Sequence, residues 1–205
     1  HHKVRSSALF DKALGMYKVN ANILSESEEI GRTRIFPRGW LENESIWLHM
    51  EYKYLLELLR RGLHQEFYRD LQKACVAFMD PEVYGRSILE NSSFIASSAH
   101  RDRALHGQGF VARLSGSTAE WIHIWMFMNA GLRPFRIDHA GRLELVLDPV
   151  LKGELFTRKA ETILWYERDG EERKALIPAD SYAFHFMGKT LVVYHNKSRR
   201  DTFGP

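Results

Sequence analysis

The stretch that decides the fold runs from residue 118 to residue 147 and reads TAEWIHIWMFMNAGLRPFRIDHAGRLELVL. Its first part, residues 118–130, carries apolar side chains on nearly every side of a predicted helix, which is typical of a helix buried all round. Gly131 and Pro134 end this helix. The second part alternates apolar and polar residues on both sides of residues 138–141, which predicts a β-hairpin. The chain therefore changes from helix to strand near residue 134.

Two more helices are predicted upstream. Residues 44–61 are apolar on nearly all sides and end at Gly62, whereas residues 64–79 are amphipathic and stop at Asp80-Pro81. A buried helix, an amphipathic helix and a second buried helix in succession suit the inner and outer rings of an α/α toroid. Three helices cannot close such a ring, so either further helices lie outside this chain or these three pair in another way. We expect residues 1–134 to be part of such a ring.

Two further hairpins follow the first. Residues 162–177 contain the favoured Asp169-Gly170 turn, and residues 182–195 turn at Met187, Gly188 and Lys189. The alternation predicts antiparallel strands with one buried face. We therefore expect an α+β chain in which residues 135–205 form a small β sandwich or sheet.

Composition excludes several classes of function. With 205 residues and 44% hydrophobic residues, the chain can bury a core. The formal charge of +3, with interleaved signs, argues against nucleic-acid binding. No apolar run approaches the roughly 18 residues that span a bilayer, and no signal peptide is visible. A single cysteine, Cys75, predicts a buried thiol and a cytoplasmic protein without a metal site. The opening His1-His2 is typical of a purification-tag remnant, which suggests a fragment of a larger protein.

Two helix starts could carry chemistry. At residues 115–118, small hydroxyl-bearing residues enter a helix, where free N–H groups and the helix dipole favour an anion. The alternative is a capping box between Ser117 and Glu120, which needs no ligand. At the other start, His49 is either a satisfied core histidine or a hydrogen-bond donor to an anion.

The loop before His49 offers candidates for sugar binding. Asn43 is a plausible N-cap, and Glu42 is either loop surface or a ligand for a sugar hydroxyl. Trp40 is the best candidate for stacking on a sugar, because Trp47, Trp121 and Trp125 occupy helical positions that are more often core.

Together these segments resemble the cellobiose, cellodextrin and chitobiose phosphorylases of glycoside hydrolase family 94. Residues 42–49, ENESIWLH, resemble the family's E-N-G-G-I-F-x-H segment, with Glu44 and Ser45 in place of the two glycines. Residues 89–94, LENSSF, stand where the family has E-P-Y. Residues 114–121, LSGSTAEW, resemble L-T-G-T-A-A-W. The resemblance covers most of residues 16–134 and, loosely, the β tail.

The resemblance implies the C-terminal portion of an (α/α)₆ barrel followed by a small β element. It implies phosphate binding by His49 and by residues of the second helix start: Ser115, Gly116, Ser117 and Thr118. One residue of slack leaves open whether Ser115-Gly116 or Gly116-Ser117 takes the family's Thr-Gly place. It implies sugar contacts from Glu42, Asn43, Trp40 and Glu90.

The family's general acid is an aspartate in a W-N-D type segment, and we find no such segment here. We therefore expect a fragment of an inverting glycoside phosphorylase that is inactive alone, with no cofactor and with inorganic phosphate as co-substrate. Its partners would be an oligo- or disaccharide, and the missing part of the barrel or a second copy of the chain. The alternatives are a non-catalytic carbohydrate-binding or scaffolding module and a fragment of an α,α-toroid hydrolase.

Overall fold

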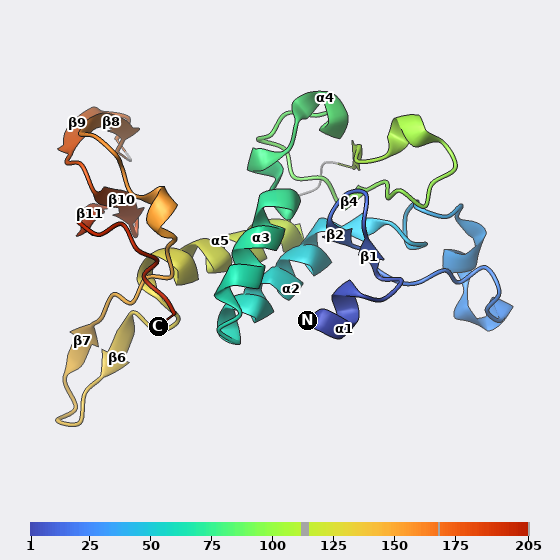
Figure 1. The fold of residues 1–205 in the computed structure, drawn as a ribbon, viewed down its shortest axis with the longest axis horizontal. Helices are drawn as coiled ribbons and strands as arrows, with labels where there is room; N and C mark the ends of the chain where they lie inside the picture. Colours follow the sequence, from blue (N-terminus) through green and yellow to red (C-terminus); the bar gives the residue numbers. More distant parts are fainter. Residues whose placement is uncertain (112–114, 168, 205) are drawn as a thin grey trace. The chain divides into compact units, whose positions relative to one another are not determined.

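The chain divides into two compact units in the computed structural model, which describes residues 1–111, 115–167 and 169–204 (Figure 1). The first unit, His1–Trp125, holds most of the helices and the long loops, and the second, Met126–Pro205, holds the β-hairpins. Helices combined with small antiparallel sheets make this an α+β fold, as the sequence predicts. The division falls inside α5 (Ser115–Ala130), whereas the sequence pattern changes at residue 134.

The first unit is built around a helical hairpin of α2 (Leu48–Arg60) and α3 (His64–Ala74). Gly62 turns the chain between them with a φ of 71°, the left-handed conformation that commonly ends a helix. The apolar residues buried on the hairpin are Leu48, Tyr52, Leu55, Leu56, Leu58 and Leu59 of α2, and Phe67, Tyr68, Leu71 and Ala74 of α3. Met50 of α2 is 46% exposed, so α2 is amphipathic rather than buried all round.

Helix α2 begins at Leu48, which corrects the predicted start at residue 44. Glu44 has a φ of 59°, and Ile46–Trp47 (β3) pair antiparallel with Phe94–Ile95 (β4). A left-handed residue followed by two paired strand residues is incompatible with helical backbone. The apolar residues at 46 and 47 therefore belong to a strand that enters the helix.

Helix α3 ends at Ala74, before the predicted limit at residue 79. Cys75 is extended, and a 3-10 turn, η3 (Val76–Phe78), follows it. Cys75 and Val76 are both buried, so the chain turns inward at this point instead of continuing along the amphipathic helix. The next helix, α4 (Pro81–Tyr84), is capped by the carboxylate of Asp80.

Short strands and turns complete the first unit. β1 (Phe10–Asp11) pairs with β2 (Met16–Tyr17), and β4 lies between β3 and β5 (Gly109–Phe110). The remaining elements are α1 (His2–Arg5), η1 (Glu28–Ile30), η2 (Arg32–Ile35) and η4 (Arg103–Leu105). The buried residues that hold strands and helices together are Met16, Ile46, Leu48, Val76, Tyr84 and Ile95.

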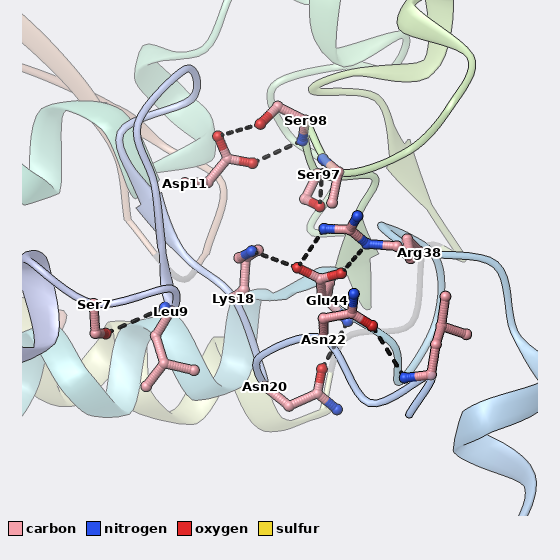
Figure 2. A network of polar contacts seen from close by, with 12 residues as sticks. Ser7, Leu9, Asp11, Lys18, Asn20, Asn22, Arg38, Glu44, Ser97 and Ser98 are labelled. Carbon is pink, nitrogen blue, oxygen red and sulfur yellow. Dashed lines mark hydrogen bonds and ion pairs between the residues drawn. The ribbon is translucent and has the colours of Figure 1, made fainter. Parts of the chain in front are cut away.

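Two buried carboxylates tie the β1–β2 hairpin to distant loops, as Figure 2 shows. Asp11 accepts hydrogen bonds from the N–H and the hydroxyl of Ser98, both at 2.7 Å. Glu44 accepts from Lys18 Nζ (2.7 Å) and from two nitrogens of Arg38. Burial would raise the pKa of Glu44, but the hydrogen bonds from Arg38 and Lys18 lower it below its ordinary value. Glu44 is therefore an ionised group held between two cations.

Helix α5 is apolar on nearly every side, as its sequence predicts, but it is not buried on every side. Ile124, Phe127 and Met128 are buried, whereas Ile122 is 57% exposed and Trp125 is 40% exposed. Part of its apolar surface therefore faces solvent. None of the helices in the described parts of the chain has the length and apolar character needed to cross a membrane.

The second unit contains the three predicted hairpins. They pair β6 (Phe135–Ile137) with β7 (Leu143–Leu145), β8 (Glu161–Tyr166) with β9 (Glu172–Ile177), and β10 (Ser181–Phe186) with β11 (Thr190–His195). Within the described residues of this unit, each hairpin is a two-stranded sheet of its own, so the three hairpins do not join into one hydrogen-bonded sheet. A 3-10 turn, η5 (Gly153–Leu155), precedes β8, and Ala130, Phe184 and Phe186 form a buried cluster.

The β6–β7 hairpin leaves one apolar face in solvent. Phe135 lies opposite Leu145 and Ile137 lies opposite Leu143, and their exposed fractions run from 48% to 70%. The residues between them, Arg136 and Glu144, form an ion pair (3.5 Å). We call the four apolar side chains the hairpin face.

Buried acidic side chains also lie between α2, α3 and β2. Glu51 is 2% exposed and accepts the backbone N–H of Tyr17 through Oε2 (3.0 Å), but its Oε1 has no hydrogen-bond partner among the described residues. Asp70 accepts from the Tyr17 hydroxyl (2.7 Å) and from Arg5 (2.6 Å). Burial raises the pKa of Glu51 to about 8, and the negative Asp70 adds to this effect, while the Tyr17 amide opposes it. Glu51 is therefore protonated at neutral pH.

This pKa predicts how pH changes stability. The pKa of Glu51 rises from 4.5 to about 8 on folding, so the folded state binds the extra proton between these values, and stability falls as pH rises through this window. Glutamine at position 51 cannot ionise. In Glu51→Gln the free energy of unfolding should therefore fall less steeply with pH, by up to about 1.4 kcal/mol per pH unit. Urea unfolding of both proteins from pH 5 to pH 8 measures the difference.

The matched control is Glu57→Gln, on the same helix but exposed and paired with Arg61. Its stability curve should run parallel to that of the unchanged protein. A Glu51→Gln curve that is also parallel would mean that Glu51 is ionised in the folded state.

Candidate functional site

His49 is the second residue of α2 and stands half-buried beside Trp47, whose ring meets the imidazole edge-on at 5.5 Å between centroids. No side chain or backbone group among the described residues forms a hydrogen bond with its ring nitrogens. Burial lowers the pKa of His49, Lys53 lowers it further, and Glu120 opposes both. His49 is therefore a neutral imidazole at pH 7, able to donate one hydrogen bond and to accept another.

The first turns of α5 lie beside the first turns of α2. Glu120 Oε1 is 3.9 Å from Lys53 Nζ, and the Glu120 charge acts on His49. Residues 49 and 53 are one helical turn apart, so both side chains lie on the same side of α2. Helices α2 and α5 therefore meet at this point through their second turns, with Lys53 and Glu120 in contact and His49 one helical turn before Lys53.

The predicted phosphate-binding residues of α5 differ in how exposed they are to solvent. Ser117 is 4% exposed, and Thr118 is exposed. Ser115 and Gly116 belong to the first turn of α5, but their side-chain surroundings lie outside the described residues, as does Leu114. The one-residue ambiguity in the Ser/Gly turn therefore remains open.

The capping box between Ser117 and Glu120 is wrong. Helix α5 begins at Ser115, so Ser117 lies within the first turn and not at the N-cap. The Glu120 carboxylate pairs with Lys53 of α2, and its Oε2 is buried without a hydrogen-bond partner among the described residues. Glu120 therefore takes part in the contact with α2 instead of closing its own helix.

The loop candidates are held by the protein itself. The Trp40 ring packs against Phe110 (4.4 Å between centroids) and Phe94 (5.1 Å), so much of its stacking surface is covered. Asn43 is fully buried and is not an N-cap, because α2 begins at Leu48 with Trp47 in the N-cap position; its Nδ2 donates to the Phe36 carbonyl oxygen (2.7 Å).

The two predicted acidic sugar contacts differ in how they are held. Glu42 pairs with Arg32 through Oε1 (2.8 Å), and its Oε2 is buried without a hydrogen-bond partner among the described residues. Glu90 is exposed and lies 3.4 Å from Arg86. Its neighbour Asn91 is 3.4 Å from the Tyr52 hydroxyl of α2. The segment that resembles E-P-Y therefore runs along α2, but Glu90 itself faces solvent.

A cavity of about 90 Å³ lies next to these residues and is lined by Tyr52, Asn91 and Trp121, with Cys75 at its wall. Burial raises the pKa of the Cys75 thiol, which makes Cys75 a buried, protonated side chain as the sequence predicts. Trp121 lies one residue after Glu120, so the cavity adjoins the contact between α2 and α5. Its polar lining comes from an amide and a phenol, which suits a neutral ligand.

Glu120 is the acidic group beside His49, and its carboxylate lies 3.9 Å from Lys53, whereas Asp11 and Glu51 do not face His49. Asp11 accepts hydrogen bonds from Ser98 and from the backbone amides of Ala13 and Leu14, which gives it a structural role (Figure 2). Glu51 is protonated, but two helical positions separate it from His49, a rotation of about 200°, so the two side chains point to opposite sides of α2.

The arginines that precede the site in the sequence already have partners within the protein. Arg32 pairs with Glu42, Arg38 pairs with Glu44, and Arg34 donates to the Leu24 carbonyl oxygen. Lys53 is the cation that sequence reasoning missed. Lys53 follows His49 by one helical turn, a spacing that carries no functional signal by itself.

Comparison with known proteins leaves the family open, because no protein-family model matches this chain and no curated protein matches it. Among the described residues, no group of three or more His, Cys, Asp and Glu side chains is arranged to hold a metal ion.

The electrostatics of His49 make a direct prediction. Replacing Lys53 by Met removes a neighbouring cation and should raise the pKa of His49, whereas Glu120→Gln removes an anion and should lower it. NMR titration of the imidazole, assigned with His49→Asn, measures both shifts. Lys12→Met alters an exposed lysine and should leave the His49 titration unchanged. Identical titrations in all variants would show that α5 does not approach His49 in solution.

Proposed function

We propose that this chain carries the phosphate- and sugar-binding part of an inverting glycoside phosphorylase of the cellobiose phosphorylase type. The observation that supports this most is the contact of Glu120 with Lys53 beside His49, because it joins the two helices to whose first residues the resemblance assigns phosphate. They are separated by more than sixty positions in the chain, roughly the span of a small domain.

The state of His49 suits an anion site. Its ring nitrogens have no hydrogen-bond partner among the described residues, so the imidazole can donate to a phosphate oxygen. Free N–H groups at the start of a helix such as α5, together with the helix dipole, favour the same anion. Lys53, one turn from His49, would add a positive charge.

The loop before α2 supports the same proposal. The resemblance puts a family glycine where Glu44 stands, and the φ of 59° at Glu44 lies in the region that glycine favours. The backbone at this position therefore has the form that the motif requires, although the side chain differs.

In this proposal, phosphate attacks the anomeric carbon of a β-glycoside while an aspartic acid protonates the leaving oxygen, giving an α-sugar 1-phosphate. Phosphate replaces the water that an inverting hydrolase activates with a second carboxylate, so one acid is enough. His49 and the start of α5 would hold the phosphate oxygens as charge moves to the leaving group. The aspartic acid, and the helices that complete an (α/α)₆ barrel, would come from outside this chain.

Glu120 favours a second candidate, a fragment of an α,α-toroid hydrolase. A carboxylate beside His49 repels phosphate, and a carboxylate in that place could instead activate a water molecule. Phosphate binding at His49 would count against this candidate.

The first test is calorimetric titration of inorganic phosphate into the full chain. We expect saturable binding that His49→Asn weakens at least ten-fold, about 1.4 kcal/mol, through loss of the imidazole donor. The matched control, His123→Asn, changes an exposed histidine of α5 and should bind phosphate normally. Equal affinity in the two variants would remove His49 from the site.

The second test is a coupled assay for sugar 1-phosphate with phosphate and β-linked gluco-disaccharides. We expect no product from the folded chain, because the general acid is missing. Product formation would mean that an acid lies within these 205 residues. Release of free glucose that does not depend on phosphate would favour the hydrolase candidate instead.

A further inference from the structure

A second cavity, of about 150 Å³, lies in the first unit and is lined by Glu51 of α2. Its other walls are the rings of Tyr17 and Tyr54 and the apolar side chains of Val4, Leu9, Val19 and Met50, with Lys18 at one side. Because Glu51 and His49 point to opposite sides of α2, this cavity is separate from the candidate phosphate site. It combines a mostly apolar lining with one buried carboxyl group.

Glu51 differs from the neighbouring buried carboxylates in its partners. Asp70 is paired with Arg5 (2.6 Å), and Glu44 is paired with Lys18 (2.7 Å) and Arg38. Both cations near the cavity, Arg5 and Lys18, are thus already bound to another carboxylate. Glu51 forms no ion pair with any described residue, and its Oε1 lacks a hydrogen-bond partner there.

An unsatisfied buried carboxyl oxygen costs about 1–3 kcal/mol, so a ligand that gives it a hydrogen-bond partner is favoured, and once the carboxyl group ionises that partner must be a donor. A cation offsets more of this cost than a neutral donor does, because it also stabilises the ionised carboxylate. The apolar walls suit an alkyl chain, and the tyrosine rings attract a positive charge at their faces. The described residues offer no set of three ligands for a metal ion, which leaves an organic cation.

We propose that this cavity binds a small organic cation, a primary alkylammonium, with its ammonium group on Glu51 and its alkyl chain against the apolar wall. The protonated carboxyl group gives its proton to solvent, and the ammonium N–H groups then donate to the carboxylate. No covalent bond changes. The site rests on Glu51 and its cavity and not on the proposed phosphorylase function.

The binding should depend on pH in a defined way. Below about pH 8, each ligand bound displaces about one proton, and affinity rises up to about ten-fold per pH unit before levelling off. The other charged and titratable groups around Glu51 are Lys18, Tyr17, Tyr52, Tyr54 and Asp70, with Arg5 and His1 beyond Asp70. Burial raises the pKa of all three tyrosines, so they stay neutral through this range.

The test is calorimetric titration of n-butylammonium into the full chain at pH 7, in two buffers that differ in their enthalpy of ionisation. We expect one saturable site and release of about one proton per ligand, read from the difference between the buffers. n-Butanol, which has the same chain length and no charge, should bind at least ten-fold more weakly. Tight butanol binding, absence of proton release or absence of saturation would each overturn the proposal.

Glu51→Gln keeps the shape of the side chain and should weaken butylammonium binding at least ten-fold, whereas Glu57→Gln on the same helix should not change it. Met50→Trp provides a second variant that keeps Glu51 and narrows the cavity from a half-exposed position, and it should also weaken binding. Unchanged binding in both Glu51→Gln and Met50→Trp would overturn the proposal. Phosphate titration of the same variants should be unaffected, which separates this site from His49.

Discussion

The ion cluster around Glu44 is the interaction on which the arrangement of the candidate site depends. The carboxylate is buried, with Lys18 of the N-terminal hairpin on one side and Arg38 of the preceding loop on the other. The buried pair is Lys18–Glu44, with side chains 11% and 2% exposed, whereas the Arg38 side chain is 45% exposed, so loss of Glu44 would leave Lys18 without its buried partner. The three segments therefore hold one another in place.

The cluster also determines how α2 starts. Ser45 alone separates Glu44 from β3, and β3 runs without a break into α2, so the backbone position of Glu44 constrains where Trp47 and His49 stand. The left-handed φ of Glu44 is unfavourable for a residue with a side chain. The ion pairs and the hydrogen bond from its amide to Asn20 (2.7 Å) offset this cost. A local conformational penalty is thus compensated by contacts with residues far away in the sequence.

The sequence predicted those elements whose pattern is local. All three hairpins of the second unit were found, because alternation and turn residues determine a hairpin over a short stretch. The α2–α3 hairpin was also found, together with its turn at Gly62. The start of α2 was missed because residues 46 and 47 fit a helical apolar pattern as well as a strand, and only pairing with Phe94–Ile95 distinguishes the two. The separation of the hairpins into three sheets likewise depends on tertiary contacts that no short pattern encodes.

The candidate site was predicted in part. His49 and the start of α5 were selected from the sequence, whereas the contact that joins their helices, between Lys53 and Glu120, was not foreseen. Glu120 was assigned to its own helix because Ser117 stands three positions before it, a spacing that a capping box shares with many unrelated pairs. Lys53 stood within a helix predicted to be buried all round, where a lysine carries no functional signal. Both roles depend on the packing of α5 against α2. This is a contact between distant parts of the chain, which the spacing of residues in the sequence does not reveal.

The hairpin face has a consequence for the behaviour of the chain in solution. Its four uncovered apolar side chains lie on a two-stranded ribbon whose outer edges keep unpaired backbone groups, a combination that promotes aggregation. The net charge of +3 supplies little colloidal repulsion against it. Such a chain loses solubility as concentration or ionic strength rises, since salt screens the remaining charge while the apolar attraction persists. Dilute, low-salt samples are therefore the conditions that oppose self-association through the hairpin face.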